Sequence, residues 1–282
     1  MTLTEELKSP LGLIAGNGSF PLEFVESAQR RGLSVVAVAH TGETDAEIER
    51  YVDQCTWVKV GELGKIIKTF KKAGVKQAFF AGGIKRIKLF GGVRLDLKGL
   101  SVLSKVRSVK DDAILRGIAD EIEQNGIRVL SASILLENSV PSEGLLTSRA
   151  LTAEEREDAL VAWDAARAIG ALDIGQSVVA CEGIVTAVEA VEGTDAAIRR
   201  GAELAKNAGV VVKLCKPHQD LRFDLPAVGT KTIEVMAECG VTALVIEAGK
   251  SLILNRQAFV EKANNAKIAV LAAESKKYLL NQ

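Results

Sequence analysis

Residues 11–39 read LGLIAGNGSFPLEFVESAQRRGLSVVAVA and contain a complete strand–helix–strand pattern. Residues 11–15 and 33–39 are short apolar runs typical of buried strands, and residues 21–31 form an amphipathic stretch that ends at Gly32. Two consecutive strands joined by one helix form a right-handed crossover and pair in parallel. The pattern predicts an α/β fold in which helices cover a parallel sheet.

The same alternation continues through the first half of the chain. Further apolar runs that predict strands lie at residues 57–60, 75–81 and 127–131, and helical patterns lie at 63–72 and over much of 102–124. No internal repeat or low-complexity tract interrupts them. We therefore expect the N-terminal half to be a Rossmann-like parallel-sheet domain with helices on both faces.

A change in composition separates this half from the next. Residues 138–150, NSVPSEGLLTSRA, are rich in serine, proline and glycine. Thr152 with Glu154 and Glu155 then caps a new helix that runs to about residue 169. We place a linker here, which predicts a Rossmann-like N-terminal domain at residues 1–138 and a C-terminal catalytic α/β domain at residues 139–282.

The second half is also an α/β pattern, but it contains a hairpin. Apolar runs at residues 177–181 and 184–190 flank a Glu182-Gly183 turn and predict two antiparallel strands. Strands are then expected at 210–214, 242–246 and 268–271, and helices at 194–207, 230–238 and 257–265. Because of the hairpin, we expect a mixed sheet in this domain.

The overall composition excludes several classes of protein. The 36 basic and 36 acidic residues cancel, so a broadly cationic surface for nucleic acid is not expected. The four cysteines form no C-x-x-C pair, which indicates free thiols in a reducing compartment. The start, MTLTEELKSP, lacks a signal peptide, and no apolar run reaches the roughly 18 residues of a membrane span. We expect a soluble, cytoplasmic protein.

Residues 212–234, VKLCKPHQDLRFDLPAVGTKTIE, concentrate charge at the end of a predicted strand. Carboxylates bind hard divalent cations, basic side chains neutralise phosphoryl oxygens, and the amides at a helix start bind anions. The segment therefore indicates a site for a phosphate together with a divalent metal; a salt-bridged connection between strand and helix is the alternative. The candidate residues are Lys213, Lys216, Gln219, Asp220, Arg222, Asp224, Thr230, Lys231 and Thr232.

Two glycine turns follow strands of the first half, at the edge where doubly wound domains bind phosphate. The pattern is not the dinucleotide fingerprint, because Pro21 replaces the third glycine and no ribose-binding acid follows the second strand at His40. Tight turns that need glycine for backbone reasons are the alternative. The candidate substrate-binding residues are Gly16, Asn17, Gly18, Gly82 and Gly83.

A third candidate turn precedes a helix in the second half. Gly193 and Thr194 would face a phosphate at the helix start, and Glu192 would lie near a metal ion. The alternative is that Thr194 is an ordinary N-cap. The only histidines, His40 and His218, lie in different halves, so a two-histidine metal site within one domain is not expected.

Five segments of the chain, taken in order, resemble one known family. They are LGLIAGNGSFP, FFAGGIKR, VEGTDAAIRRG, KPHQDLRFDLPAVGTKTIE and VIEAGKSLIL, and they extend over nearly the whole chain. These motifs resemble those of the LpxI-type UDP-2,3-diacylglucosamine pyrophosphatases. The resemblance implies an enzyme of lipid A biosynthesis that hydrolyses the pyrophosphate of UDP-2,3-diacylglucosamine to 2,3-diacylglucosamine 1-phosphate (lipid X) and UMP.

The resemblance also implies a cofactor and partners. It implies dependence on Mg²⁺ and an essential aspartate at Asp224. From the residues themselves, Mn²⁺ is a further candidate metal, and Asp220 and Glu192 are further candidate ligands. The implied partners are the lipid-linked sugar nucleotide, held between the two domains, and the surface of the inner membrane. A homodimer is left open, and nucleic acid is not expected.

Hydrolysis of a pyrophosphate needs positive charge near the reacting phosphorus, because anionic oxygens repel the nucleophile. Lys213, Lys216 and Arg222 are the candidates to supply this charge, and the helix start at Thr230 would hold the leaving phosphate. Two other classes stay open from the residues alone. They are a nucleotide-sugar oxidoreductase and a non-catalytic nucleotide-binding regulator.

Overall fold

The computed structural model describes residues 6–84, 95–105, 111–206, 208–223 and 225–281. The chain forms two compact units. Unit 1 contains Met1–Leu136 together with Asp220–Asp224, and unit 2 contains Glu137–Gln219 together with Leu225–Gln282. The charged segment therefore contributes to both units.

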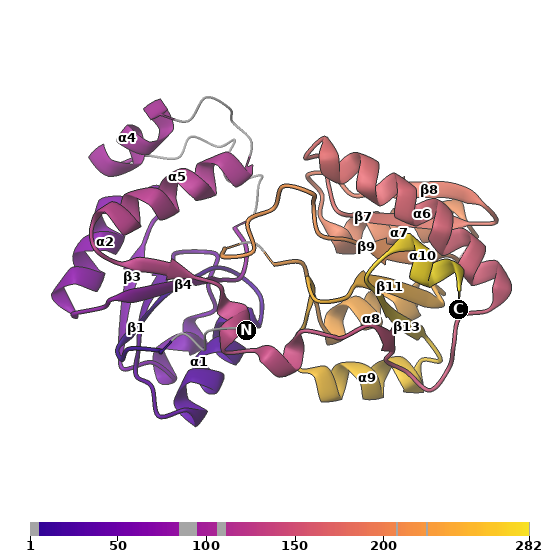
Figure 1. Cartoon of the computed structure of the whole chain (residues 1–282), viewed down its shortest axis with the longest axis horizontal. Coiled ribbons are helices and arrows are strands. Elements are labelled where there is room, and N and C mark those ends of the chain that lie inside the picture. The colour runs from indigo at the N-terminus through magenta and orange to yellow at the C-terminus, as the bar shows by residue number, and fades with distance from the viewer. Residues whose placement is uncertain (1–5, 85–94, 106–110, 207, 224, 282) are drawn as a thin grey trace. The chain divides into compact units, whose positions relative to one another are not determined.

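Unit 1 contains a five-stranded parallel sheet with the order β3-β2-β1-β4-β5. Its strands are β1 (Leu11–Ala15), β2 (Val35–His40), β3 (Gln54–Val58), β4 (Gln77–Ala81) and β5 (Arg128–Leu130). Its helices include α1 (Phe20–Arg30), α2 (Leu63–Lys72), α4 (Leu97–Lys105) and α5 (Asp111–Gln124). The strand order reverses between β1 and β4, as in a doubly wound fold, so the predicted Rossmann-like sheet is confirmed (Figure 1).

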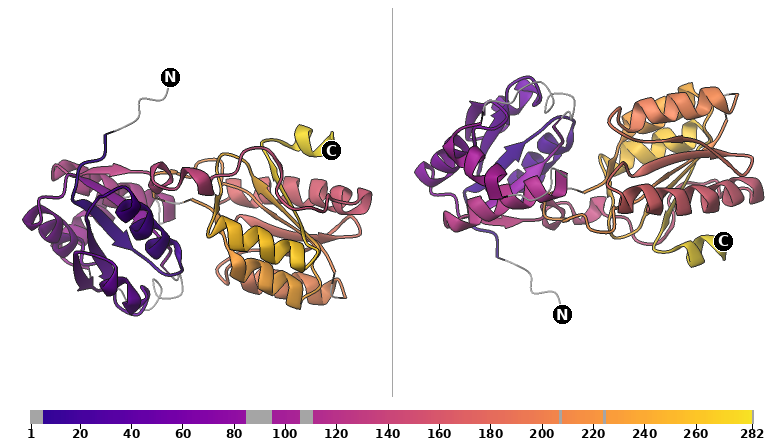
Figure 2. Two further views of the ribbon diagram at one scale, coloured as in Figure 1. Left: turned by 90° about the horizontal axis from the view of Figure 1, so that it is seen from below. Right: turned by 90° about the horizontal axis from the view of Figure 1, so that it is seen from above.

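Alternating side chains along β4 face two different helical layers of unit 1. Phe79 packs against Phe24 of α1, with 5.0 Å between the ring centroids. The preceding Ala78 lies in a separate buried cluster with Phe70 of α2 and Ile122 of α5. Because a strand directs successive side chains to opposite faces, helices cover both faces of this sheet (Figure 2).

Unit 2 contains a six-stranded sheet with the order β6-β13-β11-β9-β7-β8. Its strands are β6 (Gly144–Leu145), β7 (Ser177–Cys181), β8 (Ile184–Val188), β9 (Val210–Lys213), β11 (Ala243–Glu247) and β13 (Ala269–Ala273). β9, β11 and β13 are parallel, whereas β7 is antiparallel to both β8 and β9. The predicted hairpin and the predicted mixed sheet are both confirmed.

Helices cover both faces of this second sheet as well. They are α6 (Ala153–Ala171), α7 (Thr194–Leu204), α8 (Thr230–Glu238), α9 (Arg256–Asn265) and α10 (Lys276–Leu280); a small second sheet pairs β10 (Ala227–Val228) with β12 (Leu252–Ile253). Val212 of β9 packs in one cluster with Trp163 of α6, and Val211 packs in another with Ile198 of α7. Lys213 has the parity of Val211 and therefore faces the layer of α7.

Three details differ from the sequence prediction. The helical segment expected at 102–124 forms two helices, since α4 ends at Lys105 and α5 begins at Asp111; residues 106–110 lie outside the described residues. α7 ends at Leu204 because Ala205 is its C-cap and Lys206 has a left-handed φ of 56°. The segment expected to be a linker contributes β6, which pairs with β13.

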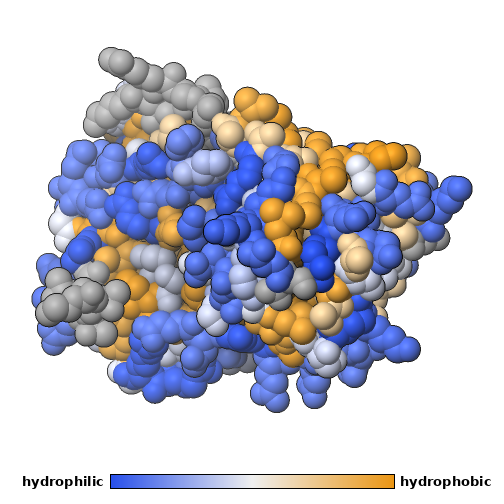
Figure 3. Space-filling view, turned by 45° about the vertical axis from the view of Figure 1, so that its right-hand side comes forward, coloured by the Kyte–Doolittle hydropathy of each residue, from blue (hydrophilic) through white to orange (hydrophobic). Residues whose placement is uncertain are grey.

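No helix among the described residues is long and apolar enough to cross a membrane. Hydrophilic side chains cover most of the face seen in Figure 3, and hydrophobic side chains form smaller areas between them. The apolar residues of the two units lie mainly in their buried clusters.

Candidate functional site

Four strands of unit 2, β8, β9, β11 and β13, end at one edge of its sheet, here named the carboxyl edge. In the sheet register, Ser177 at the start of β7 lies opposite Lys213, the last residue of β9. Val178 lies opposite Val188 at the end of β8, and Ile246 near the end of β11 lies opposite Lys213. The segments that follow β8, β9 and β11 therefore start side by side, and ligands of open α/β sheets bind at such an edge.

Lys213 is a buried cation at the carboxyl edge, with 7% of its surface exposed. Its Nζ donates to Oγ1 of Thr194 at 3.0 Å, and Thr194 in turn donates to Oε1 of Glu189 at 2.9 Å. Thr194 is the first residue of α7, so the ammonium lies beside a helix start. Both the ammonium and the positive end of the helix dipole attract an anion such as phosphate.

The N-cap of α7 is Gly193, not Thr194, and no side chain caps this helix. Gly193 has a left-handed φ of 84°, which glycine adopts without strain. The ordinary N-cap alternative for Thr194 is therefore wrong: its hydroxyl instead joins Lys213 to Glu189. Sequence reasoning missed Glu189 because the strand was predicted to run to residue 190, whereas β8 ends at Val188 and Glu189 follows it.

The start of α8 lies next to the start of α7. Its N-cap is Gly229, again without a side-chain cap, and it is followed by Thr230. Lys231 is 79% exposed at its side chain and forms an ion pair with Asp195 of α7 at 3.2 Å. Thr232 is buried, so it supports the helix start from inside. The structure thus brings Lys213, Thr194 and Lys231 into one region of unit 2.

Glu192, a predicted metal ligand, is engaged by other groups. It accepts hydrogen bonds from the Arg200 guanidinium at 2.7 Å and from the amide of Ala190 at 3.1 Å. Hydrogen bonds from its own backbone amide and from Arg200 lower the pKa of Glu192. The carboxylate of Glu192 is therefore ionised, and the positive charge of Arg200 already compensates its negative charge.

The first residues of the charged segment are tied to unit 2. The Nζ of Lys216 pairs with Oδ1 of Asp173 at 2.6 Å, and this lysine is buried. The Oε1 of Gln219 accepts the Lys216 amide at 2.9 Å and closes a tight turn. Lys216 therefore supplies less positive charge to a ligand than Lys213, because a carboxylate already neutralises it.

The middle of the charged segment packs in unit 1. Arg222 binds Asp220 through Nε and Nη2, with the shortest contact at 2.9 Å, and lies 3.5 Å from Glu123 of α5. Burial raises the pKa of Asp220, but the hydrogen bonds from Arg222 outweigh burial and leave the pKa below its ordinary value. Phe223 is buried against Phe80 of β4, with 5.8 Å between the ring centroids. Asp224, the expected essential aspartate, lies outside the described residues.

The two glycine turns of unit 1 touch each other at the point where the strand order reverses. The Gly16 amide donates to Ala81 at 2.8 Å, and the Asn17 amide donates to Gly83 at 2.7 Å. A Cβ on Gly16 would lie 2.4 Å from the Gly83 oxygen, and one on Gly82 would lie 2.3 Å from the Asn17 oxygen. Close contact between the two turns therefore accounts for both glycines. Gly18 has a φ of 86°, and an added Cβ there would meet nothing within 4 Å.

A glutamate three residues after the end of β2 reaches the glycine turn after β1. The chain turns back after β2, since the amides of Glu43 and Thr44 both donate to the His40 carbonyl oxygen at 3.0 Å. This turn places Oε2 of Glu43 2.9 Å from the side-chain amide of Asn17. Glu43 is buried, so it supports the glycine turn.

The described residues include no group of three or more His, Cys, Asp and Glu side chains that could hold a metal ion. Asp220 and Glu192 each carry an arginine partner, at 2.9 Å and 2.7 Å. The two candidate ligands that the structure describes are therefore already paired with arginine side chains.

These features define a class: a two-unit α/β protein with cations and helix starts gathered at a sheet edge. Family models match both units, as the LpxI N-terminal domain over residues 10–139 and the LpxI C-terminal domain over residues 142–271. The chain belongs to the LpxI family. The resemblance drawn from the sequence motifs is thus confirmed.

A relative of known name covers nearly the whole chain. The UDP-2,3-diacylglucosamine pyrophosphatase LpxI of Caulobacter vibrioides is 37% identical over 275 residues, which are 94% of this chain and 97% of the relative.

Solved structures give weaker likenesses. The biotin carboxylase subunit of pyruvate carboxylase matches with a TM-score of 0.26 and 12% identity, over 71% of this chain and 40% of that chain. The biotin carboxylase domain of the Hydrogenobacter thermophilus 2-oxoglutarate carboxylase matches with a TM-score of 0.28 and 14% identity, over 72% and 40%. The chain thus spans less than half of either protein, and scores this low support no conclusion.

Proposed function

We propose that this protein hydrolyses the pyrophosphate bond of UDP-2,3-diacylglucosamine in lipid A biosynthesis and releases lipid X and UMP. The observation that carries the proposal is the similarity to the Caulobacter vibrioides pyrophosphatase, 37% identical over 94% of this chain. Because the match covers 97% of the relative, both units of an enzyme of this type are present.

The carboxyl edge of unit 2 supports this chemistry. A pyrophosphate carries several anionic oxygens, which repel the attacking water. Lys213 is buried, so its charge acts in a medium where water screens it weakly. Its position beside the start of α7 suits contact with a phosphoryl oxygen. Lys231 at the start of α8 lies nearby, where it is paired with Asp195.

We also propose that the reaction depends on Mg²⁺, with Asp224 as the central carboxylate. The support is chemical, since the candidate donors are carboxylates and no pair of histidines or cysteines accompanies them in the charged segment. Bound Mg²⁺ would neutralise phosphoryl oxygens and orient water. Exhaustive treatment with EDTA should reduce turnover to background, and added Mg²⁺ or Mn²⁺ should restore it. Full activity after EDTA would refute the metal dependence.

The acylated substrate leads us to propose a cytoplasmic location with peripheral contact at the inner membrane. Leu97, Leu100 and Leu103 of α4 are exposed leucines spaced three residues apart, so they share one side of the helix. Residues 84–110 contain eight basic residues and one acidic residue in the sequence. Apolar side chains with basic neighbours favour an anionic lipid surface.

One experiment separates this function from its alternatives. Pure protein is incubated with UDP-2,3-diacylglucosamine and Mg²⁺, and phosphorus NMR follows the products. UMP and lipid X in equal amounts are expected. An unchanged substrate that still binds would indicate a non-catalytic regulator, and products formed only with a nicotinamide cofactor would indicate an oxidoreductase.

A further inference from the structure

Glu247 and Arg167 hold the peptide at which β9 becomes the charged segment. The Oε2 of Glu247 accepts the Cys215 amide at 3.0 Å. The Nη1 of Arg167 donates to the Cys215 carbonyl oxygen at 3.1 Å. Arg167 and Glu247 also bind each other at 2.8 Å. One ion pair therefore fixes both the amide and the carbonyl group of Cys215. The two members of this pair are 80 residues apart in the sequence.

The carboxylate in this ion pair is almost completely buried. Glu247 has 1% of its surface exposed, and Lys250 donates to its Oε1 at 2.9 Å. Burial raises the pKa of Glu247, but hydrogen bonds from Arg167 and Lys250 outweigh it and keep the pKa below its ordinary value. Arg167 is in turn held over the Trp163 ring at 5.3 Å. Both members of the pair are therefore ionised and held in place. Removal of either partner would strongly reduce the free energy of unfolding, because it leaves the other charge uncompensated.

The held peptide sits at a sensitive point of the chain. Cys215 lies two residues after Lys213 and one before Lys216, and the segment from 214 to 223 forms no helix or strand. A segment without regular structure depends on such side-chain contacts to keep its direction. A change of direction at Cys215 therefore acts first on residues 216–219, which precede the segment's own contacts in unit 1.

We propose that Glu247 and Arg167 are positioning residues that set the path of the charged segment toward the reacting phosphate. They act through the Cys215 peptide and touch no substrate in this role. The effect on catalysis rests on the proposed function, whereas the effect on the segment's conformation does not. Neither Glu247 nor Arg167 is among the site residues predicted from the sequence.

Conservative substitutions test the proposal with little risk to folding. Arg167→Lys keeps the charge but lacks the fork that reaches both Cys215 and Glu247. Glu247→Gln keeps an acceptor for the Cys215 amide but removes the charge that holds Arg167. Matched controls are Arg149→Lys and Glu155→Gln, because this second arginine–glutamate pair lies in the same unit but contacts no residue of the charged segment.

Two measurements are made on each full-length variant. Hydrogen exchange of the peptide covering residues 214–223 should become at least tenfold faster in both test variants and stay unchanged in both controls. The kcat on UDP-2,3-diacylglucosamine should fall about 10²-fold, with KM changed less than threefold, because misplacement by about 1 Å far from the chemistry has this effect.

The outcomes separate this proposal from the proposed function. Unchanged exchange in residues 214–223 of both test variants overturns the positioning role, whatever the turnover. Faster exchange with kcat within twofold of wild type also overturns it, since the path of the segment would then not matter. A wild-type protein without pyrophosphatase activity refutes the proposed function alone, and exchange then decides whether Glu247 and Arg167 set the segment's path.

Discussion

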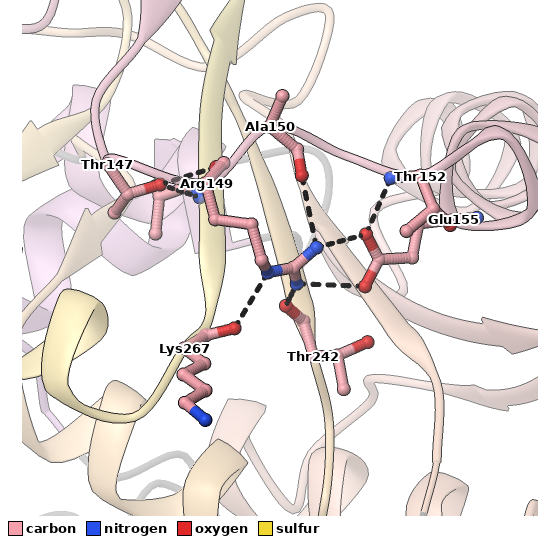
Figure 4. A network of polar contacts seen from close by, with 8 residues as sticks. Thr147, Arg149, Ala150, Thr152, Glu155, Thr242 and Lys267 are labelled. Carbon is pink, nitrogen blue, oxygen red and sulfur yellow. Dashed lines mark hydrogen bonds and ion pairs between the residues drawn. The ribbon is translucent and has the colours of Figure 1, made fainter.

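Two arginine–glutamate pairs with the same chemistry lie at opposite edges of the sheet in unit 2. At the amino edge, where β11 and β13 begin, Arg149 binds Glu155 through two contacts of 2.8 Å and 2.9 Å (Figure 4). At the carboxyl edge, Arg167 binds Glu247. Each arginine also donates to a backbone carbonyl oxygen, that of Lys267 for Arg149 and that of Cys215 for Arg167.

The difference lies in what each pair holds. Arg149 also donates to the Thr242 carbonyl oxygen, so the amino-edge pair ties together the residues just before β11 and β13. Glu155 completes the capping box of α6 with Thr152. These partners begin regular elements and carry no predicted site residue. The carboxyl-edge pair instead holds a segment rich in candidate site residues. We therefore expect the amino-edge pair to contribute to stability and the chemically similar carboxyl-edge pair to contribute to catalysis.

The first prediction has the largest expected effect. It tests whether a residue of the charged segment, which the carboxyl-edge pair holds, takes part in catalysis. Asp224→Ala should lower kcat by at least about 10³-fold, because a carboxylate that acts mainly in the transition state affects kcat more than binding. Steady-state kinetics and substrate binding by calorimetry measure both quantities. Asp224→Asn is the matched control for shape. A kcat near the wild-type value in either variant would remove Asp224 from the mechanism.

The second prediction concerns charge at the carboxyl edge. Lys213→Met should lower kcat about 10²-fold, since it removes a buried cation beside the start of α7 but keeps the length of the side chain. The comparable substitution Lys262→Met, on the exposed side of α9, should leave kcat within twofold. Equal losses of kcat in Lys213→Met and Lys262→Met would refute a specific role for the charge of Lys213 at the carboxyl edge.

The third prediction concerns stability at the amino edge. Glu155→Ala should reduce the free energy of unfolding by about 2 kcal/mol, because it leaves Arg149 without its partner and removes half of a capping box. Urea unfolding measures this change, and kcat of the folded fraction should stay within twofold. A large loss of kcat in fully folded Glu155→Ala would show that the amino edge also serves the reaction.

The smallest expected effect is on the pH dependence of stability. Burial raises the pKa of Glu155, but hydrogen bonds from Arg149 outweigh it and lower the pKa, as Arg167 does for Glu247. In both cases the unfolded state binds protons at higher pH than the folded state. Their stabilisation is therefore complete above the unfolded pKa of about 4.3 and is lost as the pH falls through the lower folded pKa.

Urea titrations between pH 6 and pH 3 measure this dependence. Glu155→Gln and Glu247→Gln should each show a shallower decrease in the free energy of unfolding on acidification. The double variant should be shallower still, since the two carboxylates lie at opposite edges and act independently. A slope equal to that of the wild type would contradict the lowered pKa of the group replaced.

The sequence predicted the elements whose signals are local. The helix at 230–238 has the predicted bounds, because Gly229 and the apolar period that follows mark it within a few residues. The hairpin at β7 and β8 was predicted from its Glu182-Gly183 turn, where both residues adopt a left-handed φ. Lys213 was predicted as a site residue because it is one of the cations of the charged segment. The structure places it buried beside Thr194, and its role stays a prediction.

The residues that were missed depend on contacts between distant parts of the chain. Glu247 was quoted within a family motif, yet its partner Arg167 lies 80 residues earlier, near the end of α6. Glu43 was missed because the turn after β2 folds back toward Asn17. Phe223 looks like any apolar residue in a loop, and only the fold shows that it packs against Phe80. The roles assigned to Asp224 and to the metal remain predictions.

The return of Asp220–Asp224 to unit 1 has a consequence for protein engineering. The backbone passes between the units three times, after Leu136, after Gln219 and again before Leu225. A gene split near residue 142 would thus give an N-terminal fragment that lacks the ring packed on Phe80. Without Phe223, a cavity the size of an aromatic ring remains beside Phe80. A cavity of this size lowers the free energy of unfolding by about 3 kcal/mol or more. The two fragments should consequently be poor independent proteins but good partners for split-protein complementation, in which each rescues the solubility of the other.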